Sequence, residues 1–352
     1  MTPKYTAASL RTLCTDILAA AGVDREDAAC VADNLVGANL RGVDSHGVLR
    51  MPSYVKWFAQ GQIAARTEPI VATETLSTAV VDARNGWGAP ASVFAMRLAI
   101  DKARQTGIAA VGVRHSNHFG YAAHYGMMPL AHDMIGISLT NAPPIVAPWG
   151  GRTSYFGTNP ICICVPAGEE RPLVYDGATT VVAHGKIMVA HAAHKPIPPN
   201  WALDKNGVPT TDPDVALDGG SLMPMSTYKG YDLAMMVDVV SGILPGAAFG
   251  PAIGALSLWG NASNVGHFFI ALDIKAFGNV ADFKAKVDEM IRQIKAVPLA
   301  SGMERIYMPG EIEFDVETAR AQEGIPVVAD VEADLRALAE RFGVTMPGPI
   351  GG

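Results

Sequence analysis

The sequence predicts an α/β protein in which both ends of the chain build a helical lobe. The first 60 residues carry mainly helical periodicity, and helical periodicity returns after residue 280. Between these regions helix-type and strand-type patterns alternate, which is typical of α/β units. The chain has 352 residues, more than one hydrophobic core usually holds, so we expect two or three lobes.

The helical patterns at the two chain ends predict the helical lobe. Residues 7–21 and 25–40 are amphipathic segments joined at Gly22, and Asp24 is placed to cap the second segment. Residues 51–60 predict a third helix. Helical patterns in the tail cover residues 280–294, 316–323 and 331–342. We expect this tail to fold back and complete the helical lobe.

The central part of the chain predicts the α/β region. The expected strands cover 78–82, 109–113, 134–140, 161–165, 173–175 and 267–274, and the expected helices cover 91–106, 122–132 and 232–244. We therefore divide the chain into the N-terminal part of the helical lobe (1–75), an α/β region (76–299) and a returning C-terminal helical segment (300–352).

Composition and charge exclude one class of partner and suggest another. The formal net charge is −7, and no run of Lys or Arg is dense enough to neutralise a row of phosphates, so we expect no nucleic-acid partner. Hydrophobic residues make up 49% of the chain and charged residues only 17%. Association with a second subunit would bury part of this apolar surface.

The sequence predicts a cytoplasmic protein outside the membrane. Its first residues lack the apolar core and cleavage site of a secretory signal, and its four cysteines form no C-x-x-C pair, so we expect reduced thiols. The run from Val239 to Gly260 has no charged residue and is long enough to span a membrane. Because Pro245, Pro251 and several glycines interrupt it, we expect a buried helix end followed by a loop.

Ser45 and His46 open the first candidate site. Arg50 and Tyr54 follow His46 at intervals of four residues, so a helix beginning here would place these side chains on one face. A histidine can give or take the proton when a carbonyl becomes a hydroxyl, and an arginine one turn away can bind a carboxylate. The same pattern also fits a capped helix whose His and Arg only pack and pair on the surface.

A second polar cluster, His-Ser-Asn-His-Phe-Gly, covers residues 115–120 directly after an expected strand. Sites in α/β proteins usually lie at such strand ends. His115 and His118 are three residues apart, which would suit a metal, but the other histidines show no recognisable ligand spacing. We therefore expect no metal site.

Three further segments are rich in glycine and small residues. Pro148–Gly151 and Gly157–Pro160 contain glycines that let the backbone approach a ligand, although each also fits an ordinary turn or hairpin. Residues 176–180, with the sequence Asp-Gly-Ala-Thr-Thr, lead to His184-Gly185-Lys186. Such small residues at a strand-to-helix junction suit a phosphate or a ribose.

Two more segments are candidates for binding an anion or closing a site. Tyr228-Lys229-Gly230-Tyr231 places a lysine near the positive end of the next helix, although lysines at helix starts are also common on surfaces. Pro309-Gly310-Glu311 fits a closing loop or a simple turn. No G-x-G-x-x-G sequence follows a strand, so other helix ends and backbone amides would have to hold a dinucleotide.

The motifs in chain order carry a family resemblance. They are R-G-V-D-S-H-G-V-L-R-M-P-S-Y, S-N-H-F-G, A-P-W-G-G, G-T-N-P, H-G-K, T-T-D-P and Y-K-G-Y. This series resembles the malate/L-lactate dehydrogenase family, which is unrelated to the Rossmann-fold enzymes of the same names. Members of this family, by the same resemblance, include ureidoglycolate dehydrogenase, diketogulonate reductase, sulfolactate dehydrogenase and the piperideine- and pyrroline-carboxylate reductases. The match runs from about Leu10 to about Glu311.

The resemblance implies an NADH- or NADPH-dependent homodimer with a non-Rossmann cofactor fold. The implied reaction moves a hydride between nicotinamide and C2 of a small 2-keto or 2-hydroxy acid of the malate, lactate, ureidoglycolate or sulfolactate type. His46 matches the acid/base residue, Arg50 would bind the substrate carboxylate, and Asp176 would orient His46. The other implied substrate contacts are Ser45, Tyr54, His118 and Thr158. The implied cofactor contacts are Asp176, Gly177, Ala178, Thr179, Thr180, Lys186, Tyr228, Lys229, Pro309, Gly310 and Glu311.

The chain departs from the family pattern in the expected cofactor wall. The departures are Gly177 and Thr180 in the usual D-M-A-T-S, His184 for a common Arg, Ser226-Thr227 for Gly-Gly, and Asp232 for Gly. A carboxylate at Asp232 would oppose a ribose phosphate, which favours NADH. Two other functions remain open: reduction of a C=N bond, in cyclic imino acids or in a keto acid plus an amine, and ligand binding without catalysis.

Overall fold

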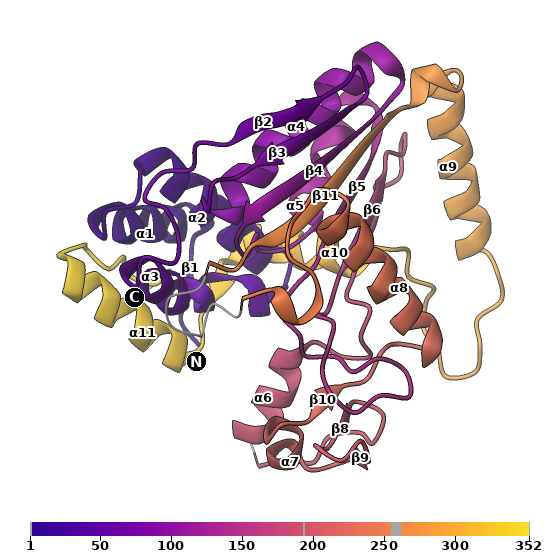
Figure 1. Ribbon diagram of the computed structural model, residues 1–352. Helices are drawn as coiled ribbons and strands as arrows, with labels where there is room; N and C mark the ends of the chain where they lie inside the picture. The colour runs from indigo at the N-terminus through magenta and orange to yellow at the C-terminus, as the bar shows by residue number, and fades with distance from the viewer. Residues whose placement is uncertain (1, 193, 255–261, 352) are drawn as a thin grey trace.

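The computed structural model describes residues 2–192, 194–254 and 262–351. Figure 1 shows three parts: a helical lobe, a central sheet with the helices that cover it, and a small third lobe. The predicted α/β architecture is confirmed, because one seven-stranded sheet lies at the centre of the chain and helices from both chain ends pack together beside it.

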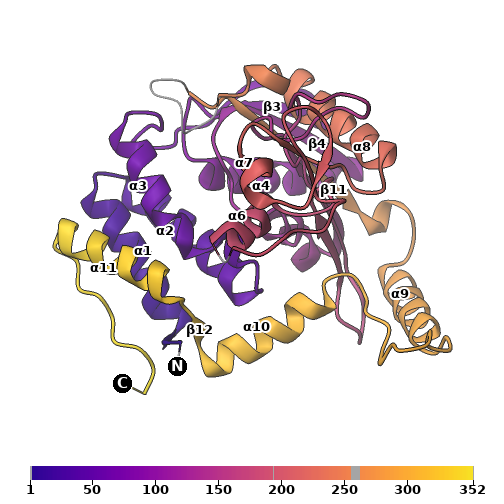
Figure 2. The same cartoon turned by 90° about the horizontal axis from the view of Figure 1, so that it is seen from below.

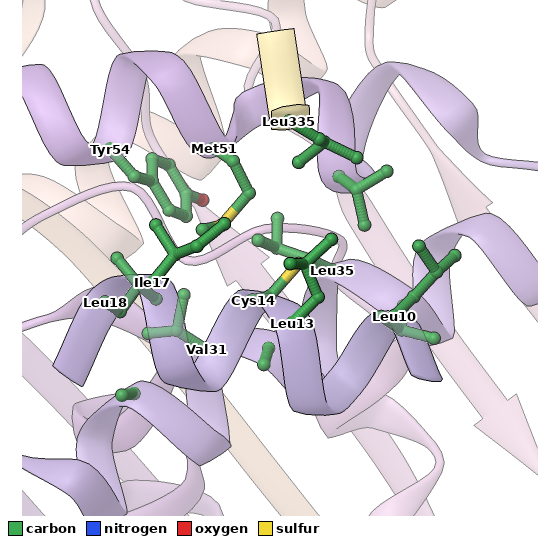
Figure 3. Close-up of a cluster of buried hydrophobic side chains, with 14 of the residues drawn as sticks. Leu10, Leu13, Cys14, Ile17, Leu18, Val31, Leu35, Met51, Tyr54 and Leu335 are labelled. Carbon is green, nitrogen blue, oxygen red and sulfur yellow. The ribbon is translucent and has the colours of Figure 1, made fainter. Parts of the chain in front are cut away.

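The helical lobe consists of α1 (Ala7–Ala20), α2 (Arg25–Leu40), α3 (Met51–Ala59) and α11 (Ala329–Phe342). The first two helices begin where the sequence provides a cap. Thr6 accepts a hydrogen bond from the N–H of Ser9, and Asp24 accepts one from the N–H of Glu26. Apolar side chains from all four helices form one core, which Figure 3 shows. Tyr54 belongs to this core, which fixes the position of its ring.

The central sheet has the strand order β2-β3-β4-β11-β5-β6-β7. The strands are β2 (Ile70–Glu74), β3 (Thr78–Asp82), β4 (Ile108–Ser116), β5 (Met134–Thr140), β6 (Ile161–Val165), β7 (Leu173–Gly177) and β11 (Val265–Asp273). Only β3 and β4 are parallel neighbours, and the helix α4 (Gly88–Thr106) connects them. The other neighbouring pairs of this sheet are antiparallel.

Helices cover both faces of the sheet. On one face, α4 and the short α5 (Ala123–Gly126) pack against apolar side chains such as Val111 and Phe269. On the other face lie α8 (Tyr228–Asp238) and its continuation (Val239–Ile243). Pro245 follows this continuation and lies close to the sheet. A Cβ atom added at Gly112 in β4 would lie 2.8 Å from Cβ of Pro245. The central strands of the sheet therefore lie between helices on both faces, whereas β2 at one edge is exposed.

The third lobe has a small core of its own. It contains α6 (His184–Ala192), α7 (Pro213–Leu217) and a three-stranded sheet of β8 (Ala202–Leu203), β9 (Pro209–Thr210) and β10 (Ser221–Leu222). The core includes Val182, Ile187, Ile197 and Leu222. Sequence periodicity did not predict these elements, because the strands have two residues each and the helices are short.

The tail divides between two ends of the molecule. The helix α9 (Val280–Lys295) lies away from the helical lobe (Figure 1), and its Asp288 accepts the backbone N–H groups of residues 168–170. The expectation that this helix completes the helical lobe is therefore wrong. By contrast, α10 (Glu311–Glu323) leads back to the lobe, where β12 (Ile325–Pro326) pairs with β1 (Lys4–Tyr5) and α11 packs on α1 (Figure 2).

Two predicted helices differ in the structure. Residues 122–132 form α5 and then a separate 3₁₀ turn (Met128–His132), because Pro129 lacks the N–H group that a continuous helix would use. The helix expected from residue 232 begins at Tyr228 and becomes a π-helix over Val239–Ile243.

The long uncharged run does not form a single apolar helix. Its first five residues are the π-helix, and a Gly-rich loop follows. Residues 255–260 of the run lie outside the described part of the chain. Among the residues that the structure describes, no helix has both the length and the apolar character needed to cross a membrane.

Candidate active site

Residues 44–50, which we call the His46 turn, connect α2 to α3. They form two short 3₁₀ turns, Asp44–His46 and Val48–Arg50, with an extended Gly47 between them. A continuous helix beginning at His46, the condition for the shared face considered above, is not formed, and α3 begins at Met51. Glycine is required at position 47 because a Cβ atom would lie 2.2 Å from the side-chain oxygen of Asn39.

The His46 turn nevertheless brings the predicted side chains together. The rings of His46 and His118 stack with their centroids 5.7 Å apart, and Tyr54 lies edge-on to His118 at 5.9 Å. The hydroxyl of Tyr54 lies 2.7 Å from Nδ1 of His118, and the N–H of Gly120 donates to the same atom. Because both groups can donate, Nδ1 is the acceptor, and Nε2 of a neutral His118 carries the proton.

Burial keeps the two stacked histidines neutral. Loss of hydration, and then the charge of Arg50, lower the pKa of His46 to about 4. The same two causes, in that order, lower the pKa of His118 well below its usual value. Burial also raises the pKa of the Tyr54 hydroxyl, which therefore stays protonated. The cluster thus offers neutral proton donors and acceptors beside one cation.

Arg50 and Ser45 complete this side of the site. Nε of Arg50 donates a hydrogen bond to the carbonyl oxygen of Ser45 at 2.8 Å. This bond fixes the position of the guanidinium group at Nε. The hydroxyl of Ser45 lies 2.9 Å from Nδ1 of His46. With Nδ1 engaged, Nε2 is the atom of His46 that is left to exchange a proton with a ligand.

Asp176 lies near the end of β7, and the partners described for it are Ala123 and Arg41. Its Oδ2 accepts the N–H of Ala123 at 2.8 Å, and Arg41 is the cation that acts on it. The carboxyl group is exposed to solvent, yet protein surrounds it at longer range, and this desolvation raises its pKa to about 6. The role of Asp176 in orienting His46 stays a prediction, since the hydrogen bond described for its carboxyl group goes to Ala123.

The third lobe forms the opposite wall of the site. A Cβ atom at Gly185 would lie 3.8 Å from Cβ of Ser45, so the start of α6 faces the His46 turn. His184, the first residue of α6, is exposed, and partial desolvation and then the charge of Arg50 lower its pKa. Lys186 is also exposed, in the first turn of this helix.

Residues 176–180 lead from β7 toward α6, and hydrogen bonds join them to the segment before α8. Thr179 donates from its N–H (2.9 Å) and its hydroxyl (2.8 Å) to the carbonyl oxygen of Thr158, and its own carbonyl accepts the N–H of Met225. Thr158, Thr179 and the start of α8 are therefore held together. Tyr228 and Lys229 are the first residues of α8, and both are exposed.

Ser226 and Thr227 precede α8 in left-handed backbone conformations, with φ values of 47° and 62°. Glycine adopts such conformations without strain, whereas a β-branched residue rarely does. The departure from the family's Gly-Gly, seen in the sequence, is therefore a strained one in the structure.

Residues 309–311 dock on β7 near Asp176. The carbonyl oxygen of Pro309 accepts the N–H of Val174 at 2.9 Å. Gly310 has a φ of +83°, and a Cβ atom there would lie 2.7 Å from Cβ of Val174, so no larger residue fits without movement. Glu311 begins α10 and accepts hydrogen bonds from Lys295 and from the N–H of Met308.

Comparison with known proteins decides the family. A family model described as malate/L-lactate dehydrogenase matches residues 5–336. The chain belongs to the malate/L-lactate dehydrogenase family. A malate dehydrogenase of Pyrococcus horikoshii is 41% identical over 335 residues, which cover 93% of this chain and 92% of that protein. A ureidoglycolate dehydrogenase (NAD(+)) of Escherichia coli K12 is 35% identical, with 93% of each chain covered.

Solved structures of this family have the same fold. Malate dehydrogenase from Entamoeba histolytica superposes with a TM-score of 0.94 at 30% identity, covering 99% of this chain and 100% of that one. A delta1-piperideine-2-carboxylate reductase from Pseudomonas syringae superposes with a TM-score of 0.88 at 30% identity, covering 96% and 100%. The predictions of the family, its non-Rossmann α/β fold and a dehydrogenase of hydroxy acids are therefore confirmed.

The residues present fit a nicotinamide dinucleotide, the cofactor of this family. The exposed lysine and the positive end of the helix dipole at the start of α8 suit an anionic pyrophosphate, and the exposed carboxylate of Asp176 suits hydroxyl or amide groups. Within the described ranges, no group of three or more His, Cys, Asp or Glu side chains forms a possible metal site.

Sequence reasoning overlooked the residues that support the His46 turn. They are Asn39, Arg41, Asp44 and Arg320. Arg41 and Asp44 belong to the R-G-V-D-S-H motif, which could have raised them as candidates, whereas nothing in the local sequence of α10 marks Arg320.

Proposed function

We propose that this chain moves a hydride between a nicotinamide dinucleotide and C2 of a small 2-keto or 2-hydroxy acid, with His46 as the acid/base residue. The observation that carries the proposal is the neutral pair of stacked histidines beside the guanidinium group of Arg50. Membership of the dehydrogenase family supports the reaction class.

Arg50 and His46 would act on neighbouring groups of the substrate. Arg50 binds the carboxylate through charge-assisted hydrogen bonds, and this places C2 and its oxygen beside His46. A bound nicotinamide supplies the hydride exchange at C2. In the oxidation direction, His46 is already neutral and accepts the hydroxyl proton at Nε2. In the reduction direction it must first bind a proton, which the negative charge of the bound substrate favours.

His118 and Tyr54 would orient the oxygen of the substrate. Because Nδ1 of His118 accepts from Tyr54, its Nε2–H is free to donate to an oxygen atom. Tyr54 packs in the core of the helical lobe (Figure 3), and its hydrogen bond to Nδ1 fixes the ring of His118. The Nε2–H of His118 therefore has a fixed direction. Ser45 holds Nδ1 of His46, and Thr158 lines the site from the segment that Thr179 fixes.

The cofactor would lie along β7, residues 176–180, the start of α8 and residues 309–311. Asp176 to Thr180 form the floor, and Tyr228, Lys229 and Lys186 supply exposed polar groups around it. Asp232 lies exposed in the first turns of α8, four residues after Tyr228. Its charge opposes an added ribose phosphate, so we propose NADH rather than NADPH as the preferred cofactor.

A homodimer in the cytoplasm is also part of the proposal. The exposed side of α8 and its continuation carries several apolar side chains, namely Leu233, Met236, Val239, Ile243 and Leu244. Contact with a second copy would remove this apolar surface from water. The four cysteines are all free thiols, as a reducing compartment favours.

One relative supports a second candidate function. The structural neighbour from Pseudomonas syringae is a reductase of a cyclic imino acid, and the same Arg50 and His46 would serve a C=N bond next to a carboxylate. Assays of pyruvate with and without methylamine, and of a cyclic imino acid, separate the two functions. Faster NADH oxidation with the imine substrates than with any keto acid would favour the second.

The variant His46→Ala tests the proposal. We expect kcat to fall by about 10²- to 10⁴-fold, the usual contribution of a general acid or base. NADH affinity, measured by fluorescence titration, should stay within about twofold, because His46 does not touch the proposed cofactor wall. A panel of 2-keto and 2-hydroxy acids with both cofactors identifies the substrate first. The matched control is His132→Ala, which changes an exposed histidine outside the site. Unchanged turnover in His46→Ala would exclude His46 as the acid/base residue.

A further inference from the structure

Arg320, in the last turn of α10, binds the His46 turn through a set of hydrogen bonds to Asp44 and Asn39 that we call the clamp. Arg320 donates from Nη1 to Oδ1 of Asp44 at 2.7 Å and from Nη2 to Oδ2 at 2.9 Å, which is a bidentate pair. Nη1 also donates to the carbonyl oxygen of Asn39. Arg320 and Asp44 are 276 residues apart in sequence, so only the folded chain brings them together.

Asn39 extends this clamp to both sides of His46. Its side-chain nitrogen donates to Oδ1 of Asp44 at 2.6 Å, and its side-chain oxygen accepts the N–H of Val48 at 2.8 Å. Asp44 lies two residues before His46 and Val48 lies two residues after it. The backbone that carries His46 is therefore fixed at both ends by one buried asparagine, which Arg320 holds in turn.

The helix α10 connects this clamp to the proposed cofactor wall. At its start, Pro309 and Gly310 dock on β7 two residues before Asp176. At its middle, the buried Arg41 pairs with Glu317 at 2.8 Å and stacks on Phe314 at 4.4 Å. An α-helix rises about 1.5 Å per residue, so α10 spans about 14 Å from Glu311 to Arg320.

We infer that Arg320 is a positioning residue for the reaction: through Asp44 and Asn39 it fixes the His46 turn relative to the cofactor wall. The inference rests on the proposed role of His46. Displacing a reacting group by about 1 Å can lower a rate by about 100-fold, so a clamp two residues away affects turnover without touching the substrate.

The exposure of the pair indicates an effect on catalysis more than on folding. The Asp44 side chain is 46% exposed and that of Arg320 is 18% exposed. Water can therefore solvate the Asp44 carboxylate when Arg320 is replaced, so this replacement leaves no buried charge without solvent. The geometry of the His46 turn, in contrast, depends directly on the two hydrogen bonds and on Asn39.

Three variants test the inference: Arg320→Met, Asp44→Asn and the double variant. The conservative variant Arg320→Lys keeps the charge but loses the bidentate geometry. Arg336→Met is the control, because Arg336 also pairs with a carboxylate, that of Glu332, but within α11 and not with the His46 turn. For each protein we would measure kcat, substrate KM, NADH affinity by fluorescence, and hydrogen exchange of the backbone amides in residues 43–50 without ligands.

We expect Arg320→Met to lower kcat by about tenfold or more and to speed exchange in residues 43–50, while NADH affinity changes by less than about twofold. Asp44→Asn should behave similarly, and the double variant should be no worse than the poorer single one, because both remove the same interaction. Arg320→Lys should recover part of kcat. Arg336→Met should match the wild type.

Two results would separate the failure of this inference from the failure of the proposed function. If the wild type turns over a keto or hydroxy acid and Arg320→Met does so at the same kcat, the clamp does not position His46 and the inference is overturned. Additive losses in the double variant would overturn it as well. If the wild type shows no nicotinamide-dependent turnover with any acid or imine, the proposed function fails before the variants are compared.

Discussion

The two walls of the site are built in different ways. The wall that carries His46, Arg50 and Tyr54 is part of the helical lobe, and hydrogen bonds fix its backbone on both sides of His46. The opposite wall consists of the start of α6 and the residues before α8, whose side chains are exposed. Ser226 and Thr227 in that wall are even strained.

This contrast indicates that the two walls have different roles in the proposed function. In the proposed reaction, the wall that carries His46 would contact the groups that all 2-keto and 2-hydroxy acids share, the carboxylate and the oxygen at C2. The exposed wall would face the cofactor and the variable end of the substrate, and it carries several departures from the family pattern, namely His184, Ser226 and Thr227. Selectivity can therefore change there without disturbing the residues that exchange the proton.

The largest effect that would test this contrast is expected from Arg50→Met. Loss of charge-assisted hydrogen bonds to a carboxylate costs about 1.5–3 kcal/mol, so kcat/KM should fall by roughly 10- to 100-fold, mainly through KM. Steady-state kinetics on the identified substrate measures this. An unchanged KM would contradict the carboxylate role, and Arg66→Met, at an exposed arginine, is the control.

The pH dependence of hydroxy-acid oxidation should be the next largest effect. Burial and Arg50 lower the pKa of His46 to about 4, so the residue stays neutral and able to accept a proton at pH 5 and above. Activity should fall as the pH drops through about 4, by about tenfold per pH unit below that point. A profile of kcat/KM from pH 3 to 8 checks this, and a midpoint near 6.5 would contradict it.

On the exposed wall, His184→Arg should change selectivity more than rate. A second permanent cation near Arg50 should raise the preference for a dicarboxylate over a monocarboxylate by about fivefold, since an exposed charge pair contributes about 1 kcal/mol. The ratio of kcat/KM for oxaloacetate and pyruvate measures the effect. His191→Arg, on the same helix, should leave the ratio unchanged; an equal shift in both variants would point to a general charge effect.

The smallest effect is expected from Thr227→Gly. Relief of left-handed strain contributes about 1–3 kcal/mol, and the extra freedom of glycine in the unfolded chain costs about 0.5–1 kcal/mol. The free energy of unfolding should therefore rise by roughly 1 kcal/mol, which urea denaturation can measure. Thr73→Gly, in strand β2, should lower it instead. A fall in stability for Thr227→Gly would show that its side chain makes a compensating contact.

Local patterns were sufficient for much of the fold. Strands 78–82, 134–140 and 161–165 were predicted with the bounds that the structure has, because apolar runs and turn residues mark them clearly. The prediction failed for the elements of the third lobe, which are too short for periodicity. It also failed for the direction of α9, since an amphipathic helix does not specify which apolar surface it will cover.

The sequence by itself determined the family and the chemical groups of the site, because motifs such as R-G-V-D-S-H and S-N-H-F-G name the residue types and their order. Tertiary structure decided how those groups work. The stacking of His46 on His118, their lowered pKa values and the partner of Asp176 all depend on burial and on segments distant in sequence. Arg320 supports Asp44 only because α10 returns to the helical lobe, a contact that local sequence does not encode.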